Sequence, residues 1–230
     1  MFDPGYMIMV MLPTLVLSGV ASWMTKSAFN KYSRVRARNG YTGAQAAQLL
    51  LDRAGIQDVK VVRTSGYLSD HYNPMNKTLA LSEPVHDSTS VAAIGVACHE
   101  AGHAIQHAKN YAPLWARSAI VPMAGIGSNF GLYGMMFGLM FNWTGLVMIG
   151  ALLFAGVVVF QLVTLPVEFD ASARAKKLAA EYGLVGRDEQ VGINRVLNAA
   201  ALTYVAAAAS SILTLLYFLM RAGLLGGRND

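Results

Sequence analysis

Two histidines and a glutamate lie close together in the run His99-Glu100-Ala101-Gly102-His103, which has the residue types and the spacing of a zinc-binding catalytic motif. Residues four apart lie on one face of a helix, so His99 and His103 can bind one metal ion while Glu100 points toward an open coordination position. A catalytic zinc ion takes three protein ligands and activates a water molecule, whose proton a nearby carboxylate removes. We therefore expect Zn²⁺ as the cofactor and Glu100 as the catalytic base.

The setting of the motif argues against two ordinary buried histidines. The preceding residues 91–98 are apolar on all sides, and burying two imidazoles and a carboxylate there without a cation would leave polar groups unpaired. The lone cysteine, Cys98, has no partner for an internal disulfide and is expected to be a small core residue.

A third ligand is required, and His107 continues the four-residue spacing. On a helix, however, it lies about 12 Å from His99 along the axis, too far for two zinc–nitrogen bonds of about 2.1 Å to one ion. The longer signature with a third histidine six residues after His103 is also absent, because Lys109 occupies that position. We expect His107 to lie beyond the ligands or to face solvent.

An acidic pair further along the chain offers the third ligand. Glu168 is expected to open a helix that follows an apolar span, begins near Pro166 and ends at residues 182–183. Asp170 is the alternative, and on a helix its side chain points about 200° away from that of Glu168, so both cannot face the metal. The plainer interpretation is that both are acidic residues favoured at the start of a helix.

The composition indicates a membrane protein, because 54% of the 230 residues are hydrophobic and only 13% are charged. Four apolar segments approach the roughly 20 residues that a helix needs to cross a bilayer. These segments are residues 7–23, 118–140, 145–165 and 199–220. The first has Asp3 before it and its cations after it, unlike a signal peptide, so we expect it to remain attached.

The placement of the cations predicts the orientation in the membrane. Of 18 Lys and Arg residues, 11 lie between Trp23 and Ser118, 5 lie between Leu165 and Ala199, and 2 follow Met220. The positive-inside rule then places both large polar segments in the cytoplasm and both termini outside. We interpret the net charge of +5 as this topological signal, with a possible contact to lipid headgroups, and expect no nucleic-acid partner.

The expected domain organisation follows from these segments. The parts are an N-terminal transmembrane helix (1–24), a cytoplasmic catalytic part with the metal-binding helix (25–117), a transmembrane hairpin (118–165), cytoplasmic helices with the third zinc ligand (166–198), and a C-terminal transmembrane helix with a short tail (199–230). The cytoplasmic residues are numerous enough for one modest core.

A small sheet is predicted before the metal-binding helix. Thr42 and Gln45 form a capping box for a helix over residues 43–54, and residues 59–64, 67–72 and 77–82 have the pattern of strands. We expect the third strand to be an edge strand beside the metal that holds an extended substrate by backbone hydrogen bonds, with a plain structural hairpin as the alternative. The substrate-holding residues would be Lys77, Thr78, Leu79, Ala80 and Leu81.

Glycines mark a helix face in the second apolar segment. Four glycines there share one face and permit close packing against another span, for which the small residues 206–211 are the expected partner. The same face could support a homo-oligomer or contact with another membrane protein. The glycines are Gly127, Gly131, Gly134 and Gly138.

The chain resembles the bacterial membrane zinc metallopeptidases of the YugP-like group over nearly its whole length, through residues 68–72, 79–82, 99–107, 165–175 and 196–206. The resemblance implies His99, His103 and Glu168 as zinc ligands and Glu100 as the base. This group is similar to the HtpX-type and prenyl-protein membrane proteases, in which an aspartate follows the glutamate ligand by four residues.

Ser172 stands at the position of that aspartate. Asp170 or Asp70 is therefore the expected substitute.

The sequence thus predicts an α-helical integral membrane protein with four transmembrane helices and a cytoplasmic zincin-like (gluzincin) α+β catalytic domain with a small sheet. Its expected function is that of a zinc endopeptidase of the plasma membrane, acting on protein or peptide substrates in or near the lipid bilayer. His71, Tyr72 and Arg174 are the candidates for a donor to the oxyanion. The alternative is a membrane scaffold or chaperone with a structural zinc site, which a fourth protein ligand would favour.

Overall fold

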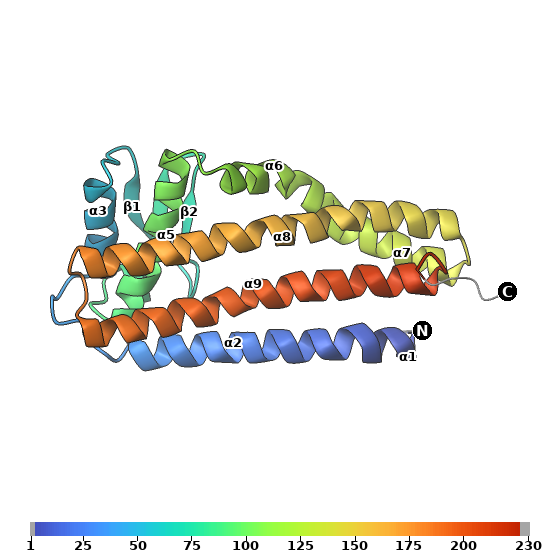
Figure 1. The fold of residues 1–230 in the computed structure, drawn as a ribbon, viewed down its shortest axis with the longest axis horizontal. Helices are drawn as coiled ribbons and strands as arrows, with labels where there is room; N and C mark the ends of the chain where they lie inside the picture. Colours follow the sequence, from blue (N-terminus) through green and yellow to red (C-terminus); the bar gives the residue numbers. More distant parts are fainter. Residues whose placement is uncertain (1–2, 226–230) are drawn as a thin grey trace. The chain divides into compact units, whose positions relative to one another are not determined.

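The computed structural model of the chain describes residues 3–225, which are mostly helical (Figure 1). The long helices are α2 (Leu12–Tyr32), α5 (Val91–Ala108), α8 (Thr144–Glu181) and α9 (Arg187–Arg221). The shorter helical elements are α1 (Pro4–Tyr6), α3 (Gly43–Arg53), α4 (Glu83–His86), α6 (Ala112–Ile126) and α7 (Leu132–Met140), with the π-helical turns η1 (Met7–Met11) and η2 (Gly127–Gly131). The strands are β1 (Lys60–Thr64), β2 (His71–Asn73) and β3 (Thr78–Ser82).

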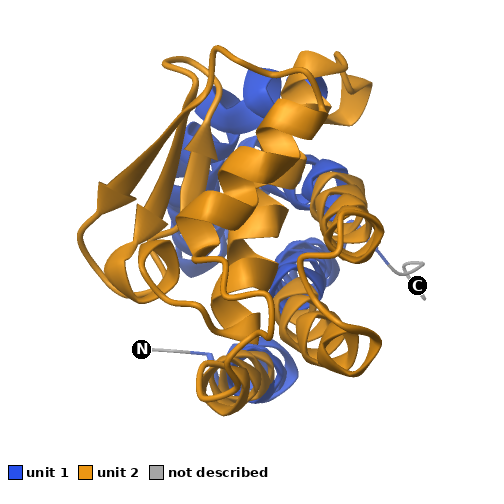
Figure 2. Ribbon diagram, turned by 90° about the vertical axis from the view of Figure 1, so that its left-hand side faces the viewer, with its two compact units in different colours: residues 1–20, 115–165, 203–230 blue, residues 21–114, 166–202 orange. Residues whose placement is uncertain are grey.

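Two compact units make up the chain, and Figure 2 distinguishes them by colour. Unit 1 comprises residues 1–20, 115–165 and 203–230, and unit 2 comprises residues 21–114 and 166–202. The small sheet and the predicted metal-binding motif, residues 99–103, therefore belong to unit 2.

Three helical runs in the described chain are long and apolar enough to cross a membrane. They are Pro4–Tyr32, Thr144–Glu181 and Arg187–Arg221. The remaining apolar segment is helical as well, from α6 through η2 to α7 without a gap, but it is not among the helices that are both long and apolar enough to span.

Unit 1 packs α8 against the helical segment that carries the glycines. A side chain added at Gly127 would lie 2.2 Å from the carbonyl oxygen of Leu153, and one added at Gly138 would lie 2.7 Å from the backbone nitrogen of Val147. Only glycine allows backbones to approach this closely. The partner of this glycine face is therefore α8, not residues 206–211 as expected from the sequence.

The core of unit 2 surrounds α5, which lies beside the small sheet (Figure 1). The buried side chains that pack around α5 come from α3, β3, α8 and α9, among them Leu50, Leu79, Ala175 and Ile193. Helix α3 begins at the predicted capping box, in which the Thr42 hydroxyl accepts from Gln45 N and the Gln45 side chain accepts from Thr42 N.

The strand order is β1-β3-β2, with β1 parallel and β2 antiparallel to β3. Strand β3 is therefore central, and the expectation that residues 77–81 form an edge strand is wrong. The physical reason is visible in the burial of Leu79, Ala80 and Leu81, since three consecutive buried apolar residues are typical of a strand covered on both faces. Residues 78–80 are paired with β1 on one side and with β2 on the other, so no free edge remains there for a substrate strand.

The second strand is shorter and later than predicted. Residues 67–70 are not extended, because Gly66 and Leu68 have φ of +105° and +57°. Just before β2 begins, the Asp70 carboxylate accepts a hydrogen bond from Ser82 N at 2.7 Å and another from Ser82 Oγ. A side chain thus replaces backbone pairing at this point of the sheet.

Helix α8 continues through Pro166 without a break, so Glu168 does not open a separate helix. Proline lacks the N–H of the ladder and normally ends or kinks a helix. Here apolar helix-forming residues precede it and Val167 and Ala171 are buried after it, so packing on both sides maintains the helix. The predicted stop is confirmed, because α8 ends at Glu181 and Gly183 follows with φ of +65°.

Candidate metal centre

Helix α5 presents the two histidines of the motif to α8. Its first turn is capped by Ser90, whose hydroxyl accepts from Ala93 N at 3.2 Å. In the second half of the helix, Gly102 lies against α8 so closely that an added Cβ would be 2.7 Å from the carbonyl oxygen of Ala171. This close approach brings Glu168 to the face of α5 that carries His99 and His103.

The side chains of His99, His103 and Glu168 converge within unit 2, with one candidate ligand atom from each, all within 4.8 Å of one another. Glu168 Oε2 lies 3.2 Å from His99 Nε2 and 3.5 Å from His103 Nε2. A tetrahedral zinc ion with bonds of about 2.0–2.1 Å separates its ligand atoms by about 3.4 Å. The two distances to Glu168 Oε2 therefore match the spacing of ligands around a tetrahedral zinc ion.

The three candidate ligand side chains are shielded from water, with exposed fractions of 13%, 10% and 2% for His99, His103 and Glu168. Burial raises the pKa of Glu168, but the hydrogen bonds and charges of His103 and His99 outweigh burial and hold that pKa well below its ordinary value. Burial lowers the pKa of His103. The hydrogen bond with Glu168 and the charge of Glu100 raise this pKa by more than burial lowers it, so it lies above its ordinary value. Glu168 therefore keeps its negative charge, which suits the site to a cation.

Each histidine ring also has a partner at Nδ1, the ring nitrogen that does not face Glu168. Ser172 Oγ lies 3.1 Å from His99 Nδ1, and Gln106 Oε1 lies 3.0 Å from His103 Nδ1. Partners of this kind fix the orientation of a metal-binding imidazole and leave Nε2 for the ion. Ser172 stands where related proteases are expected to have an aspartate, and here the serine itself makes the contact.

Gln106 connects His103 to α8. Its Nε2 donates to the carbonyl oxygen of Val167 and to Asp170 Oδ2, both at 2.8 Å. Asp170 in turn accepts two hydrogen bonds from Arg174, at 2.5 and 3.2 Å. Asp170 therefore acts on His103 through Gln106, and its side chain is not among the converging ligands.

Glu100 is 8% exposed and forms no hydrogen bond or ion pair with another residue of the described range 3–225. It follows His99 directly on α5, and its charge acts on His103. Its oxygens are not among the fully buried unpaired atoms of the described residues, so they keep access to the site. Such a group is suited to accept a proton from a bound water.

The other candidate residues make their contacts elsewhere. His107 Nδ1 lies 2.7 Å from the Tyr72 hydroxyl, one turn beyond His103, and it is not among the converging ligands. Burial raises the pKa of Tyr72 to about 12, so its phenol stays protonated. His71 Nδ1 contacts the carbonyl oxygen of Ser69 at 2.8 Å, and Asp70 is bound to Ser82 rather than to a histidine.

The sequence interpretation did not identify Gln106 as a site residue. One feature of the sequence could have identified Gln106, which is its position three residues after His103 on a helix side that is otherwise apolar. A polar amide in such a place needs partners. The structure supplies them from α8, with Gln106 fully buried.

The fold and the site define a class of protein, one with helices suited to a membrane and a buried centre of two histidines and one carboxylate. The chain belongs to the family described as "Putative neutral zinc metallopeptidase", which matches residues 7–223. It is 44% identical over 223 residues to a protein of Bacillus subtilis (strain 168) named "Putative membrane protease YugP", covering 97% of this chain and 98% of that protein. No solved structure matches the chain significantly.

These comparisons confirm the resemblance stated from the sequence. Family membership makes the chain a zinc peptidase by class, with zinc as its cofactor. The apolar helices and the membrane protease to which it is similar agree in associating it with a membrane.

Proposed function

We propose that the chain is a membrane-embedded zinc endopeptidase in which His99, His103 and Glu168 hold the metal and Glu100 is the general base. The observation that carries the proposal is the spacing of 3.2 and 3.5 Å between Glu168 Oε2 and the two histidine nitrogens, beside a glutamate that has no partner in the described chain. Among residues 3–225 this group of three is the one that could hold a metal ion. Three protein ligands are typical of catalytic zinc, whereas a structural site has four, which argues against the scaffold alternative.

The chemistry divides between the metal and the protein. Zinc held at this site supplies a Lewis acid that polarises the scissile carbonyl group and acidifies water. Glu100 accepts the proton of the attacking water and later returns it to the leaving amine. Ser172 and Gln106 fix the orientation of the His99 and His103 rings. The packing of α5 against α8 limits the access of bulk water.

For the substrate, we propose β2 as the docking strand. It is an edge of the sheet, it contacts α5, and no further strand in the described part of the chain pairs with it. An extended peptide can add to such an edge through backbone hydrogen bonds.

The oxyanion donor is best sought in Tyr72 or Arg174. The His71 Nδ1 proton is donated to Ser69, so neutral His71 has no proton on Nε2 to offer.

The membrane arrangement that we propose has four spans, with the helical segment 118–140 as the second in spite of its π turn. The polar residues 25–117 and 166–198 lie in the cytoplasm of a multi-pass plasma-membrane protein, because they carry 16 of the 18 Lys and Arg residues. The active site then faces the cytoplasm close to the bilayer. The domain boundaries proposed from the sequence follow the same division.

Replacing Glu100 tests the function directly. Glu100→Gln should retain zinc but lower kcat by about 10²- to 10⁴-fold, because an amide cannot accept the proton of water while the ligands stay unchanged. The measurements are zinc content by atomic spectroscopy and cleavage of an unfolded protein by the purified chain, with fragments identified by mass spectrometry to distinguish internal cleavage from trimming of the ends.

The matched control is Glu181→Gln, the same change at an exposed glutamate at the end of α8. It should leave both zinc content and cleavage as in the native chain. Full cleavage by Glu100→Gln with zinc bound would refute Glu100 as the base.

A further inference from the structure

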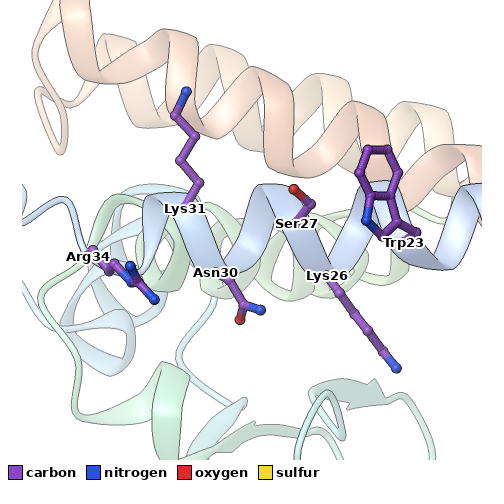
Figure 3. Close-up of a pocket in the computed structure, with 6 residues that line it drawn as sticks. All are labelled: Trp23, Lys26, Ser27, Asn30, Lys31 and Arg34. Atoms are coloured by element: carbon purple, nitrogen blue, oxygen red, sulfur yellow. The ribbon is translucent and has the colours of Figure 1, made fainter.

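The face of α2 that follows its apolar part forms a basic hollow, which is separate from the metal centre. A cavity of about 500 Å³ lies over this face and is lined by Trp23, Lys26, Ser27, Asn30, Lys31 and Arg34. Figure 3 shows Lys26 and Lys31 extending to opposite sides, with Ser27 and Asn30 between them and Trp23 and Arg34 toward the two ends. The hollow thus has a floor of small polar side chains and a cationic rim.

The cations of the rim lack counterions. Lys26, Lys31 and Arg34 form no ion pair with any residue in the part of the chain that the structure describes. Arg38, four residues further on, contrasts with them, because it pairs with Asp188 at 2.5 Å. The positive-inside rule requires only that cations follow the span, and it does not explain why these three surround a hollow without acidic partners.

The floor of the hollow offers hydrogen-bond donors. Asn30 Oδ1 accepts from the Tyr67 hydroxyl at 3.2 Å, which leaves the amide Nδ2 of Asn30 to donate elsewhere. The Ser27 hydroxyl is exposed and can also donate. Donors beside cations match the oxygens of a phosphate group, which accept hydrogen bonds and carry negative charge.

The position of the hollow along α2 selects the source of that phosphate. Leu15, Val16 and Val20 precede it as exposed apolar residues, and Trp23, which is 69% exposed, forms its edge. Exposed apolar residues fit the hydrocarbon of a bilayer, and tryptophan is enriched where hydrocarbon meets the headgroups. The cations follow Trp23, with Lys26 about one turn and Lys31 about two turns beyond it, on the side of the apolar part where headgroups would lie.

We propose that Lys26, Lys31 and Arg34, together with Ser27 and Asn30, bind the headgroup of an anionic phospholipid. The acyl chains of this lipid would lie along the apolar part of α2, and its phosphate would occupy the basic hollow. Each cation close to an anionic headgroup strengthens binding by about fivefold. The bound lipid would anchor the start of the polar part of the chain at the membrane surface, independently of the proteolytic activity.

Quenching of Trp23 fluorescence tests the proposal. The chain with Trp115→Phe and Trp143→Phe retains Trp23 as its single tryptophan. It is reconstituted in bilayers of mixed phosphatidylcholine and phosphatidylglycerol in which one or the other lipid is brominated. Brominated phosphatidylglycerol should quench several-fold more effectively than the brominated zwitterionic lipid at equal mole fraction. The triple change Lys26→Gln, Lys31→Gln, Arg34→Gln should remove this preference.

The matched control is Lys60→Gln, Lys109→Gln, Lys177→Gln, which removes the same charge from exposed positions outside the hollow. It should keep the preference. Equal quenching by the two lipids in the parent chain, or equal loss of preference in both triple variants, would overturn the proposal. Loss of the preference on adding inorganic phosphate at constant ionic strength would also overturn it, since the ligand would then be free phosphate.

Lipid retention by the chain with all its native tryptophans gives a second measurement. Native mass spectrometry of the chain released from the same mixed bilayers should show phosphatidylglycerol bound in excess over phosphatidylcholine. The excess should vanish in the variant of the hollow and persist in the control. An excess that persists in both would refute the assignment even if the variants without Trp115 and Trp143 did not fold.

Discussion

At the residue scale, the orientation of Gln106 determines the state of His103. Both hydrogens of the Gln106 amide are used, one by the carbonyl oxygen of Val167 and one by Asp170, so its Oε1 must face His103. Because Oε1 can only accept, the His103 Nδ1 carries the proton. In the neutral ring that a metal ion requires, Nε2 then carries the lone pair that binds the metal.

Gln106→Leu should therefore lower zinc affinity by about 10- to 100-fold, because a leucine of similar size fills the space but cannot hold the His103 ring. Competition with a chromophoric chelator measures the affinity of the purified chain. The control Gln48→Leu removes an exposed amide that donates to Asp52, and it should bind zinc as the native chain does. Unchanged affinity in Gln106→Leu would show that the hydrogen bond does not position His103.

The third ligand can be separated from its neighbours by the same measurement. Glu168→Ala should lose zinc almost completely, because it removes one of three ligand atoms. Asp170→Ala and His107→Ala should retain zinc, since Asp170 acts through Gln106 and His107 contacts Tyr72. Zinc retained in Glu168→Ala and lost in Asp170→Ala would transfer the ligand role to Asp170.

The sequence allowed prediction of those residues whose role is local. His99, Glu100 and His103 belong to one short motif, and Glu168 was chosen through the family resemblance. The roles of Gln106 and Ser172 depend on how closely α8 approaches α5, which no local pattern encodes. The contacts of these two residues, at 3.0 and 3.1 Å to the ring nitrogens, therefore came only with the structure.

At the scale of elements, the approach of α5 to α8 is what assembles the site. Gly102 allows it, because the distance of 2.7 Å from an added Cβ to the carbonyl oxygen of Ala171 is shorter than real Cβ contacts, and the obstacle is backbone that cannot rotate away. The glycine within the motif thus has a packing role apart from any chemical one. A local cap such as the capping box at Thr42 was predictable, whereas this helix contact was not.

Gly102→Ala should separate the two helices at the site and lower cleavage by about 10²-fold, with weaker zinc binding, because small displacements of catalytic groups are costly. The control is Gly95→Ala on the same helix, where an added Cβ would meet Ile193 at an ordinary 3.5 Å. Both changes raise helix propensity equally, so a difference between them reports the helix contact. Similar zinc affinity and cleavage in the two variants would contradict the argument.

The errors in predicting elements have one cause, which is that tertiary contacts replaced local signals. Pro166 was expected to start a helix, but α8 passes through it because buried residues on both sides hold the helix together. The segment 67–72 alternates like a strand, yet positive φ at Leu68 and the bond from Ser82 N to Asp70 leave only β2 in the sheet. Such outcomes depend on partners distant in the sequence.

At the scale of the whole molecule, the distribution of apolar and basic residues is the informative feature. Large apolar side chains such as Phe130, Leu152 and Phe141 are exposed at 69%, 77% and 67%, which is unfavourable in water and expected in hydrocarbon. The polar segments of the chain carry most of the cations. Composition alone therefore predicted membrane association, while the division of one segment by η2 could not be predicted, because π turns have no simple sequence signal.

The orientation in the membrane follows from the cations and can be tested with single introduced cysteines. The native thiol should not interfere, because Cys98 is buried and burial raises its pKa to about 12. In intact cells, a thiol reagent that does not cross the membrane should label Trp143→Cys, in the turn before α8, and should label Lys60→Cys on β1 only after permeabilisation. Both positions are exposed, so accessibility within the fold is matched. Labelling of Lys60→Cys in intact cells together with protection of Trp143→Cys would show that the metal centre faces the outside of the cell.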